Sequence, residues 1–379
     1  MGKIRGTNLG NWLVLEKWME PEMFSGTNTE DETWLSRTLG QEKLQERMKT
    51  HRDTYVTEED FKIIKSHGMN TVRIPVPYFI FGDRPPFIGC IEYLDKAFDW
   101  AEKYGLKILI DMHTTPGSQN GYDNGGICGV CNWRKKPEEV EFVTRVLEKL
   151  AERYAHRKGL FGIEVVNEPI SFSVYMTSPT HNKYVDKKEA EGSSFVPMSF
   201  LKKFYTDAYR RLRKILPEDK VIVFHDGFRL MRWGDFFEKS GMKNVMLDTH
   251  IYIFAMENFV PVHKEWVYKM YIGFNRWMLK KVEKHIPVIV GEWCICNKEA
   301  EHLKKKGAPD SEVVRAYRRV AELQLDVWEE GAGYFYWNYQ LSRDKDKPLD
   351  EEWKNAWDLS RCWKNGWMPE RLDRRSGRK

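Results

Sequence analysis

The stretch FGIEVVNEPI, residues 161–170, decides how this chain folds. Residues 162–166 are mostly apolar and β-branched, and the run is too short for a helix, so it has the pattern of a buried strand. Pro169 lacks an N–H group and biases Glu168 away from helical backbone angles, which ends the strand there. Taken alone, Asn167-Glu168-Pro169 is most simply a solvated acidic loop. At the carboxyl end of a strand in an α/β fold, however, it stands where ligands bind.

A second strand end carries a matching carboxylate. Residues 288–291 (VIVG) form another short apolar run, which leads directly into Glu292 and Trp293. Two carboxyl groups held at neighbouring strand ends are what hydrolases that work with paired carboxylic acids need. The pair Glu168 and Glu292 therefore favours a functional interpretation over the solvated loop.

The remaining sequence alternates short apolar runs with amphipathic segments. Helical periodicity is found at 57–67, 91–104, 137–157, 199–216, 262–285 and 311–330. Strands are predicted at 6–13, 70–76, 107–112, 162–166, 221–224, 245–247, 288–291 and 333–335. Eight alternating units predict the α/β class and a closed (β/α)8 barrel, expected as a single catalytic domain over 1–379. The long segments 114–136 and 341–367 predict loops that close a pocket.

Composition narrows the possible partners. The net charge is only +5, from 61 Lys and Arg against 56 Asp and Glu, so no nucleic-acid partner is expected. The basic segment 371–379 is expected to be a disordered terminus. The chain has 15 Trp and 14% aromatic residues, which mildly favours a carbohydrate ligand because sugar rings stack on aromatic faces. The glycine fingerprint of dinucleotide sites is absent, and no cofactor is expected.

The opening MGKIRGTNLG and the cysteines bear on location. The opening residues contain no apolar signal region and no stretch approaches a membrane span, so a cytoplasmic location and no membrane partner are expected. Two closely spaced pairs of cysteines could each supply half of a zinc site, but the two pairs would have to meet in space to bind the metal. We therefore favour cysteines that are structural or uninvolved in function, and expect no metal site. The oligomeric state is left open. The cysteines are Cys90, Cys128, Cys131, Cys294, Cys296 and Cys362.

Several chemically capable side chains stand at or beside the ends of different predicted strands. A barrel brings all its strand ends to one rim, so these side chains would converge. Each has a simpler explanation alone: Arg73 inside a strand needs a buried ion pair or a site, His113 suits a hydrogen-bonded core, and Trp337 suits packing. Their coincidence is hard to explain by packing. They are Arg73, His113, Asn167, Glu168, His250, Tyr252, Glu292 and Trp337.

Taken together, these residues resemble the active site of glycoside hydrolase family 5, a (β/α)8 family of retaining β-glycosidases. Three further stretches resemble its exo-β-1,3-glucanase branch, and the likeness extends over about 4–369. They are RGTNLGNWLVLE at 5–16, HGMNTVRIP at 67–75 and PGSQNG at 116–121.

The resemblance implies a role for each residue. Glu168 is the acid/base and Glu292 the nucleophile, and no metal takes part. We expect Arg73 to lower the pKa of Glu292, and the charge of Glu292 to raise that of Glu168. The implied substrate-binding residues are Asn167 at the sugar 2-hydroxyl, Arg73 and Tyr252 beside the nucleophile, His113 and His250 along the subsite, Trp337 as its floor and Glu16 in the terminal subsite.

The resemblance implies an exo-acting retaining β-glycoside hydrolase that releases glucose from β-glucans or short β-glucosides. Enzymes of that branch are typically secreted and disulfide-bonded, which leaves the linkage and aglycone open for this chain. A β-1,6-glucosidase, an endo-β-glucanase and a glycolipid glycosidase of the same family are alternatives. A non-catalytic carbohydrate-binding barrel is a further alternative, against which the presence of both Glu168 and Glu292 argues.

Overall fold

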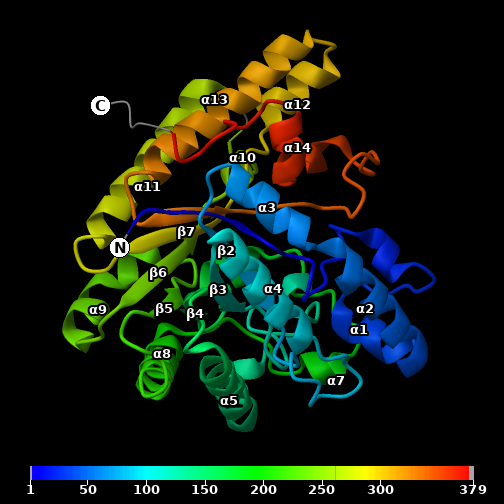
Figure 1. Cartoon of the computed structure of the whole chain (residues 1–379), viewed down its shortest axis with the longest axis vertical. Helices are drawn as coiled ribbons and strands as arrows, with labels where there is room; N and C mark the ends of the chain where they lie inside the picture. The colour runs from blue at the N-terminus through cyan, green and yellow to red at the C-terminus, as the bar shows by residue number, and fades with distance from the viewer. Residues whose placement is uncertain (1, 261, 375–379) are drawn as a thin grey trace.

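The computed structural model describes residues 2–260 and 262–374 and forms a closed parallel barrel (Figure 1). Each strand pairs with the next in chain order, and the last pairs with the first through the register Ile4 to Gly333. The predicted (β/α)8 fold is therefore confirmed. The strands are β1 (Ile4–Asn8), β2 (Thr71–Val76), β3 (Lys107–Met112), β4 (Leu160–Glu164), β5 (Val221–His225), β6 (Val245–His250), β7 (Val288–Trp293) and β8 (Gly333–Tyr336).

Helices surround the barrel, and α11 and α13 lie side by side on its outer surface (Figure 1). The longer helices are α1 (Glu32–Thr38), α2 (Gln41–Tyr55), α3 (Glu58–Ser66), α4 (Ile91–Tyr104), α5 (Pro137–Tyr154), α8 (Met198–Leu212), α9 (Gly234–Ser240), α11 (Glu265–Val282), α12 (Lys298–Lys305) and α13 (Asp310–Trp328). The shorter ones are α6 (Phe172–Thr177), α7 (Lys187–Ala190), α10 (Ile253–Glu257) and α14 (Leu359–Lys364), with 3-10 turns η1 (Pro21–Phe24), η2 (Asp123–Gly125), η3 (Trp133–Lys135), η4 (Leu230–Arg232) and η5 (Glu352–Trp357).

Strand alternation separates the core into two regions and aims polar groups inward. In β3, Ile108 and Ile110 join the large cluster shared with the helices, whereas Leu109 joins a smaller cluster that fills the barrel. Because successive side chains point to opposite faces, Asp111 shares the inward parity of Leu109. The smaller cluster comprises Ile4, Leu109, Phe161, Val221, Val223, Met246, Ile289 and Phe335. It plugs the barrel beneath the polar rim.

The prediction for the first strand was wrong in its bounds. A strand was expected at 6–13, but β1 ends at Asn8 and the chain turns at Asn11, whose φ is 61°. The segment that follows, for which no element was predicted, folds into η1, α1 and α2. The helix after it was predicted correctly. Thr57 and Asp60 form the capping box of α3, in which the Asp60 carboxylate accepts the Thr57 amide at 2.8 Å.

The C-terminal segment returns to the barrel wall. Leu372 is buried, and its amide donates to the carbonyl of His67 at 2.9 Å. Part of the segment expected to be disordered, 371–374, is thus placed, whereas 375–379 lie outside the described residues. Across the described ranges, none of the helices has the length and apolar character needed to cross a membrane.

Candidate active site

Strand ends on the carboxyl side of the barrel hold the predicted residues around one cavity of about 680 Å³. Arg73 lies in β2, His250 ends β6, and Glu292 lies in β7. Six of the predicted residues line the cavity, namely Glu16, Glu168, His250, Tyr252, Glu292 and Trp337. The other three, Arg73, His113 and Asn167, are fully buried beneath its floor.

Glu168 and Glu292 face each other across His250. The His250 Nδ1 atom lies 2.7 Å from Glu168 Oε1 and 3.3 Å from Glu292 Oε2. These two oxygens can therefore be no more than about 6 Å apart, below the gap of roughly 6.5–9.5 Å that inverting glycosidases need for a water molecule. Both side chains are almost completely buried, at 7% and 3% exposure. The spacing favours direct attack by one carboxylate.

Glu168 is held in an unusual backbone conformation. Its φ is 46°, in the left-handed region that non-glycine residues seldom adopt. Such strain is tolerated where the surrounding structure fixes it, often at functional sites. The neighbouring amide of Asn167 donates to the carbonyl of Met112 at 2.9 Å, and the Asn124 side chain donates to Glu168 Oε2 at 3.0 Å. The backbone next to Glu168 is thus held by β3, and the Glu168 carboxylate by the glycine-rich loop.

Arg73 organises the floor of the site. Its guanidinium donates to Glu164 Oε2 at 2.8 Å, to Asn167 Oδ1 at 2.9 Å and to Glu292 Oε1 at 3.2 Å. A further hydrogen bond reaches Asn8 Oδ1 at 3.0 Å. Of the two explanations left open for Arg73, the structure shows the buried ion pair, and one of its partners is the predicted nucleophile Glu292. Burial raises the pKa of Glu164 well above its ordinary value despite this cation.

Glu292 and Asn167 receive further contacts from their neighbours. The Tyr252 hydroxyl donates to Glu292 Oε2 at 2.7 Å. The Asn167 side-chain nitrogen lies 3.4 Å from His113 Nε2, and His113 stacks on Trp337 with ring centroids 5.6 Å apart. These contacts fix the orientation of Glu292 and Asn167 before any ligand enters.

The net pKa directions of the two acids differ from those expected, although Arg73 does lower the pKa of Glu292 as predicted. Burial raises the pKa of Glu292, and the cations His250 and Arg73 only partly offset it. Burial also acts on Glu168, but the hydrogen bond and charge of His250 outweigh it and lower the pKa. For His250, burial is outweighed by Glu292 and Asp248, which raise its pKa well above the ordinary value. The place of His250 between both acids thus favours its protonated form, which can act as a counter-ion to both.

Glu16 reaches the cavity from the loop after β1. Its Oε2 atom accepts the Trp18 indole N–H at 2.8 Å, and its buried Oε1 atom has no hydrogen-bond partner within the described chain. Burial, followed by the charge of Asp123, raises the pKa of Glu16 well above its ordinary value. Burial also raises the pKa of Asp123 to about 6. The Oε1 atom of Glu16, near Asp123, is therefore suited to accept a hydrogen bond from a sugar hydroxyl.

Several residues of the site were not predicted. Asn8 holds Arg73, while Asp123 and Asn124 enter from the glycine-rich loop. The punctuated loop at 114–136 was a signal for a site wall, but nothing in its sequence singles out these two positions. The aromatic wall is also formed by loops: Trp18 stacks on Trp353 with centroids 6.3 Å apart.

The structure describes the surroundings of all six cysteines. All six are buried and free. Over residues 2–260 and 262–374, the group of side chains close enough to share an ion is Glu168, His225 and His250, with ligand atoms within 4.8 Å. It contains no cysteine, and two of its members, Glu168 and His250, already contact each other at 2.7 Å. The pairs spaced as zinc half-sites therefore do not come together with other ligands.

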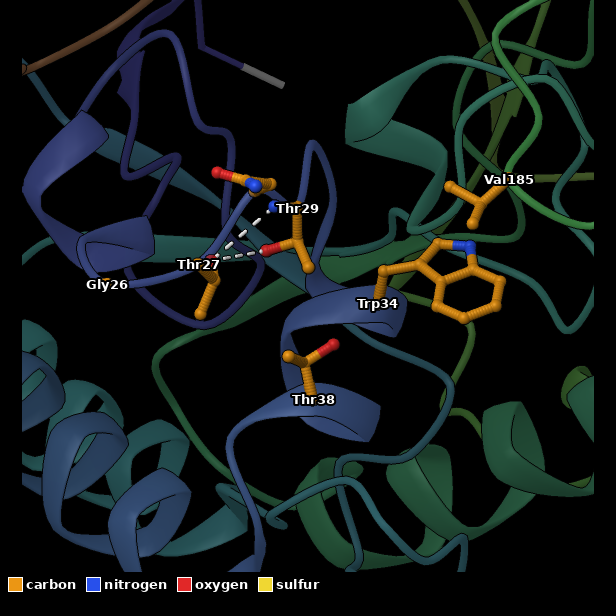
Figure 2. Close-up of a pocket in the computed structure, with 7 residues that line it drawn as sticks. Gly26, Thr27, Thr29, Trp34, Thr38 and Val185 are labelled. Carbon is orange, nitrogen blue, oxygen red and sulfur yellow. Dashed lines mark hydrogen bonds between the residues drawn. The ribbon is translucent and has the colours of Figure 1, made fainter.

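A second hollow lies between 26–29, α1 and Val185 (Figure 2). Its volume is about 420 Å³, and the hydroxyls of Thr27 and Thr29 lie 2.8 Å apart on its wall. The described residues that line it include no carboxylate or imidazole, so it offers no acid or base. They are Gly26, Thr27, Asn28, Thr29, Trp34, Thr38 and Val185.

A (β/α)8 barrel with two buried carboxylic acids at the ends of β4 and β7, facing one cavity, defines a glycoside hydrolase. Comparison with known proteins narrows this class. The family model described as "Cellulase (glycosyl hydrolase family 5)" matches residues 37–341, and the chain belongs to that family. The resemblance stated from the sequence is thus confirmed.

Named relatives cover nearly the whole chain. A protein of Aspergillus terreus called "Probable glucan 1,3-beta-glucosidase A" is 31% identical over 98% of this chain and 89% of its own. The "Glucan 1,3-beta-glucosidase" of Blumeria graminis is 31% identical over 98% and 88%. The crystal structure of rutinosidase from Aspergillus niger superposes with a TM-score of 0.75 at 22% identity, covering 97% and 98%. The last likeness concerns the fold alone.

Proposed function

We propose that this protein is an exo-acting retaining β-glucosidase that removes glucose from the ends of β-1,3-glucans and from short β-glucosides. One observation carries the proposal: two buried carboxyls share one imidazole, and their facing oxygens lie within about 6 Å of each other. The names of relatives that align with 98% of the chain support the β-1,3-glucan substrate.

The proposed chemistry has two displacements at the anomeric carbon. Glu168 gives a proton to the glycosidic oxygen as that bond breaks, and a Glu292 oxygen forms an ester bond to the anomeric carbon. The aglycone leaves as an alcohol. Water then attacks the same carbon and gives a proton to Glu168, and Glu292 leaves as a carboxylate. Two inversions give retention.

We propose that His250 supplies the proton that Glu168 delivers. The raised pKa of His250 favours a proton on the imidazole of the free protein, and Nδ1 lies 2.7 Å from the Glu168 oxygen. A bound sugar excludes water from the pair, and a drier site disfavours separated charges. Transfer from Nδ1 to Oε1 then leaves a neutral imidazole and a protonated Glu168. Glu168 is thus protonated when the substrate binds.

The exo mode follows from the closed side of the cavity. Lys354 donates to the carbonyl of Trp18 at 2.7 Å, which ties the last loop of the barrel to the first. Trp18 stacks on Trp353 and meets Trp357 edge-on at 5.3 Å. This wall stands beside Glu16, and a groove open at both ends would need a gap there. A terminal glucose unit fits such a blind end.

A product time course on laminaripentaose, with gentiobiose and an aryl β-glucoside beside it, tests the proposal. We expect glucose to appear first, as its β-anomer, and the chain to shorten one unit at a time. Internal fragments would indicate an endo enzyme, and cleavage of gentiobiose alone would indicate a β-1,6-glucosidase. Release of α-glucose would refute retention. Glu292→Gln provides the inactive control.

We also propose a cytoplasmic location. The support is chemical: all six cysteines carry free thiols, which is usual where glutathione and thioredoxin keep thiols reduced. Quantitative thiol labelling of the protein isolated from its native cells tests this proposal, since disulfides would point to an oxidising compartment.

A further inference from the structure

The outer face of α11 exposes a continuous apolar stripe. Trp266, Met270, Phe274 and Trp277 are 56%, 64%, 56% and 50% exposed, respectively. Their spacing of four, four and three residues places all of them on one face of the helix. The face lies on the outside of the barrel beside α13 (Figure 1). Exposed patches of several large apolar side chains mark interaction surfaces in soluble proteins.

Positive charge surrounds this stripe. Residues 264–284 contain six Lys and Arg against two Glu. Three of these cations are paired, since Lys269 pairs with Glu265 and both Arg276 and Lys280 pair with Glu330. Lys281 lies on the stripe itself, 5.9 Å from the Trp277 ring centroid. Within the described chain neither Lys281 nor Lys284 has a carboxylate within salt-bridge distance. The complementary partner is therefore anionic.

A second copy of the chain fits this face poorly. Two copies of the stripe would bring two segments of net positive charge together, with opposing lysines at each end. The exposed fractions of the four side chains amount to an apolar area on the order of 500 Å². Specific dimers usually bury roughly 800 Å² on each partner. Charge and area both disfavour a dimer.

A glucan chain also fits poorly. Sugar rings need aromatic faces that are open and flat, but Phe274 and Trp277 stack on each other, with centroids 5.8 Å apart and planes 25° apart. Lys281 further covers the Trp277 ring. Met270, in the middle of the stripe, has no ring to offer. A neutral glucan would also leave the surrounding positive charge without a partner.

We propose that α11 is a membrane-docking surface that lies on anionic phospholipid, with its aromatic stripe inserted among the acyl chains. Trp, Phe and Met side chains flanked by lysines are the composition of helices that lie in the membrane interface. Anionic lipids are concentrated on the cytoplasmic leaflet, where each lysine adds attraction. The sequence-based expectation of no membrane partner rested on the lack of a spanning segment, which a surface helix does not need.

The stripe begins close to the catalytic pocket. Phe259 lines the mouth of the active-site cavity and is 82% exposed. Val262, 42% exposed, precedes the first residue of the stripe, Trp266, by four positions. An enzyme docked through α11 would therefore hold its pocket mouth at the edge of the bilayer surface.

Co-sedimentation with vesicles tests the proposal. The probes are vesicles of phosphatidylcholine alone and vesicles of phosphatidylcholine mixed with phosphatidylglycerol. We expect the wild-type protein to pellet with the mixed vesicles and to dissociate as salt is raised. The double variant Met270→Ser, Phe274→Ser should bind about tenfold more weakly, because it removes half of the stripe.

The chain offers a matched control. Phe172 and Met176 on α6 are also four residues apart and are 58% and 60% exposed. Phe172→Ser with Met176→Ser should leave vesicle binding unchanged. Lys281→Glu with Lys284→Glu should weaken binding to mixed vesicles without removing any apolar side chain. Turnover of an aryl β-glucoside verifies that each variant is folded.

Four outcomes would overturn the proposal. The wild-type protein could stay in the supernatant with the mixed vesicles, or both serine pairs could weaken binding equally. Light scattering could show a dimer that only the Met270→Ser, Phe274→Ser variant dissociates, which would assign the face to a second copy. Finally, the wild-type protein could bind insoluble β-glucan through this face and ignore vesicles.

Discussion

Replacement of Arg73 by Met should be among the most damaging single changes in the barrel. The guanidinium is fully buried and makes hydrogen bonds to Asn8, Glu164, Asn167 and Glu292. Methionine fills a similar volume but leaves buried carboxylates without their cation. Removal of one partner from a buried ion pair costs about 3–5 kcal/mol, and we expect a loss of unfolding free energy in that range.

The cost should depend on pH. Without the cation, the carboxyl pKa values in the folded protein rise further above those in the unfolded chain. A carboxyl group whose pKa is raised by folding binds more protons in the folded state than in the unfolded one. The variant therefore loses stability as pH rises from the carboxyl pKa of the unfolded chain to that of the folded protein. The difference from wild type should therefore be largest near neutral pH and shrink toward the ordinary carboxyl pKa. Urea denaturation at several pH values measures both quantities.

An exposed arginine provides the control. Arg153 forms a two-point ion pair with Asp95, with its shorter contact at 2.6 Å, and its side chain is 46% exposed. Arg153→Met should cost less than about 1 kcal/mol, because solvent screens the pair. Arg73 is not the counter-ion of the buried carboxylates if Arg73→Met lowers the free energy of unfolding no more than Arg153→Met does. The same conclusion follows if the loss caused by Arg73→Met does not change with pH.

Three further predictions follow from the site and the fold. Glu292→Ala and Glu168→Ala should each lower turnover of an aryl β-glucoside by orders of magnitude, and near-normal turnover by freshly purified Glu292→Ala would remove that residue from the mechanism. His250→Gln removes a cation that lowers the pKa of Glu292, so the acidic limb of the kcat/KM pH profile, which reports ionisation of Glu292, should move to higher pH. An unmoved acidic limb would exclude His250 as the counter-ion of Glu292. Thr57→Ala removes the capping box of α3 and should cost about 1 kcal/mol in denaturant unfolding, while an unchanged midpoint would show that the cap is dispensable.

The number and order of the strands were predictable, because the alternation of apolar runs with amphipathic segments permits few arrangements other than a closed parallel barrel. Their ends were not: Pro169 was expected to end the central strand, but β4 already ends at Glu164, and the chain runs irregularly from there to Pro169. The convergence of Glu168 and Glu292 then follows from topology alone. Their roles, like those of the other predicted residues, stay predictions until variants are measured.

Other features depend on contacts that only the folded chain contains. The polar helix α2, with a long run of charged and amide side chains, has little apolar periodicity to announce it. Asn124 meets Glu168 only because a loop folds back over the rim. The pKa directions were wrong for the same reason: the position of His250 between the two acids is set by the barrel register and not by any sequence neighbour.

The wall of tryptophans has a consequence for when the enzyme becomes active in the cell. Trp18 belongs to the first loop of the barrel, and its stacking partner Trp353 follows the last strand. Trp18 is translated long before Trp353, and β1 likewise waits for β8 before the barrel can close. A nascent chain whose C-terminal segment is still inside the ribosomal exit tunnel therefore has both acids but no finished pocket. Hydrolysis therefore requires that the segment carrying Trp353 has left the tunnel and packed on Trp18.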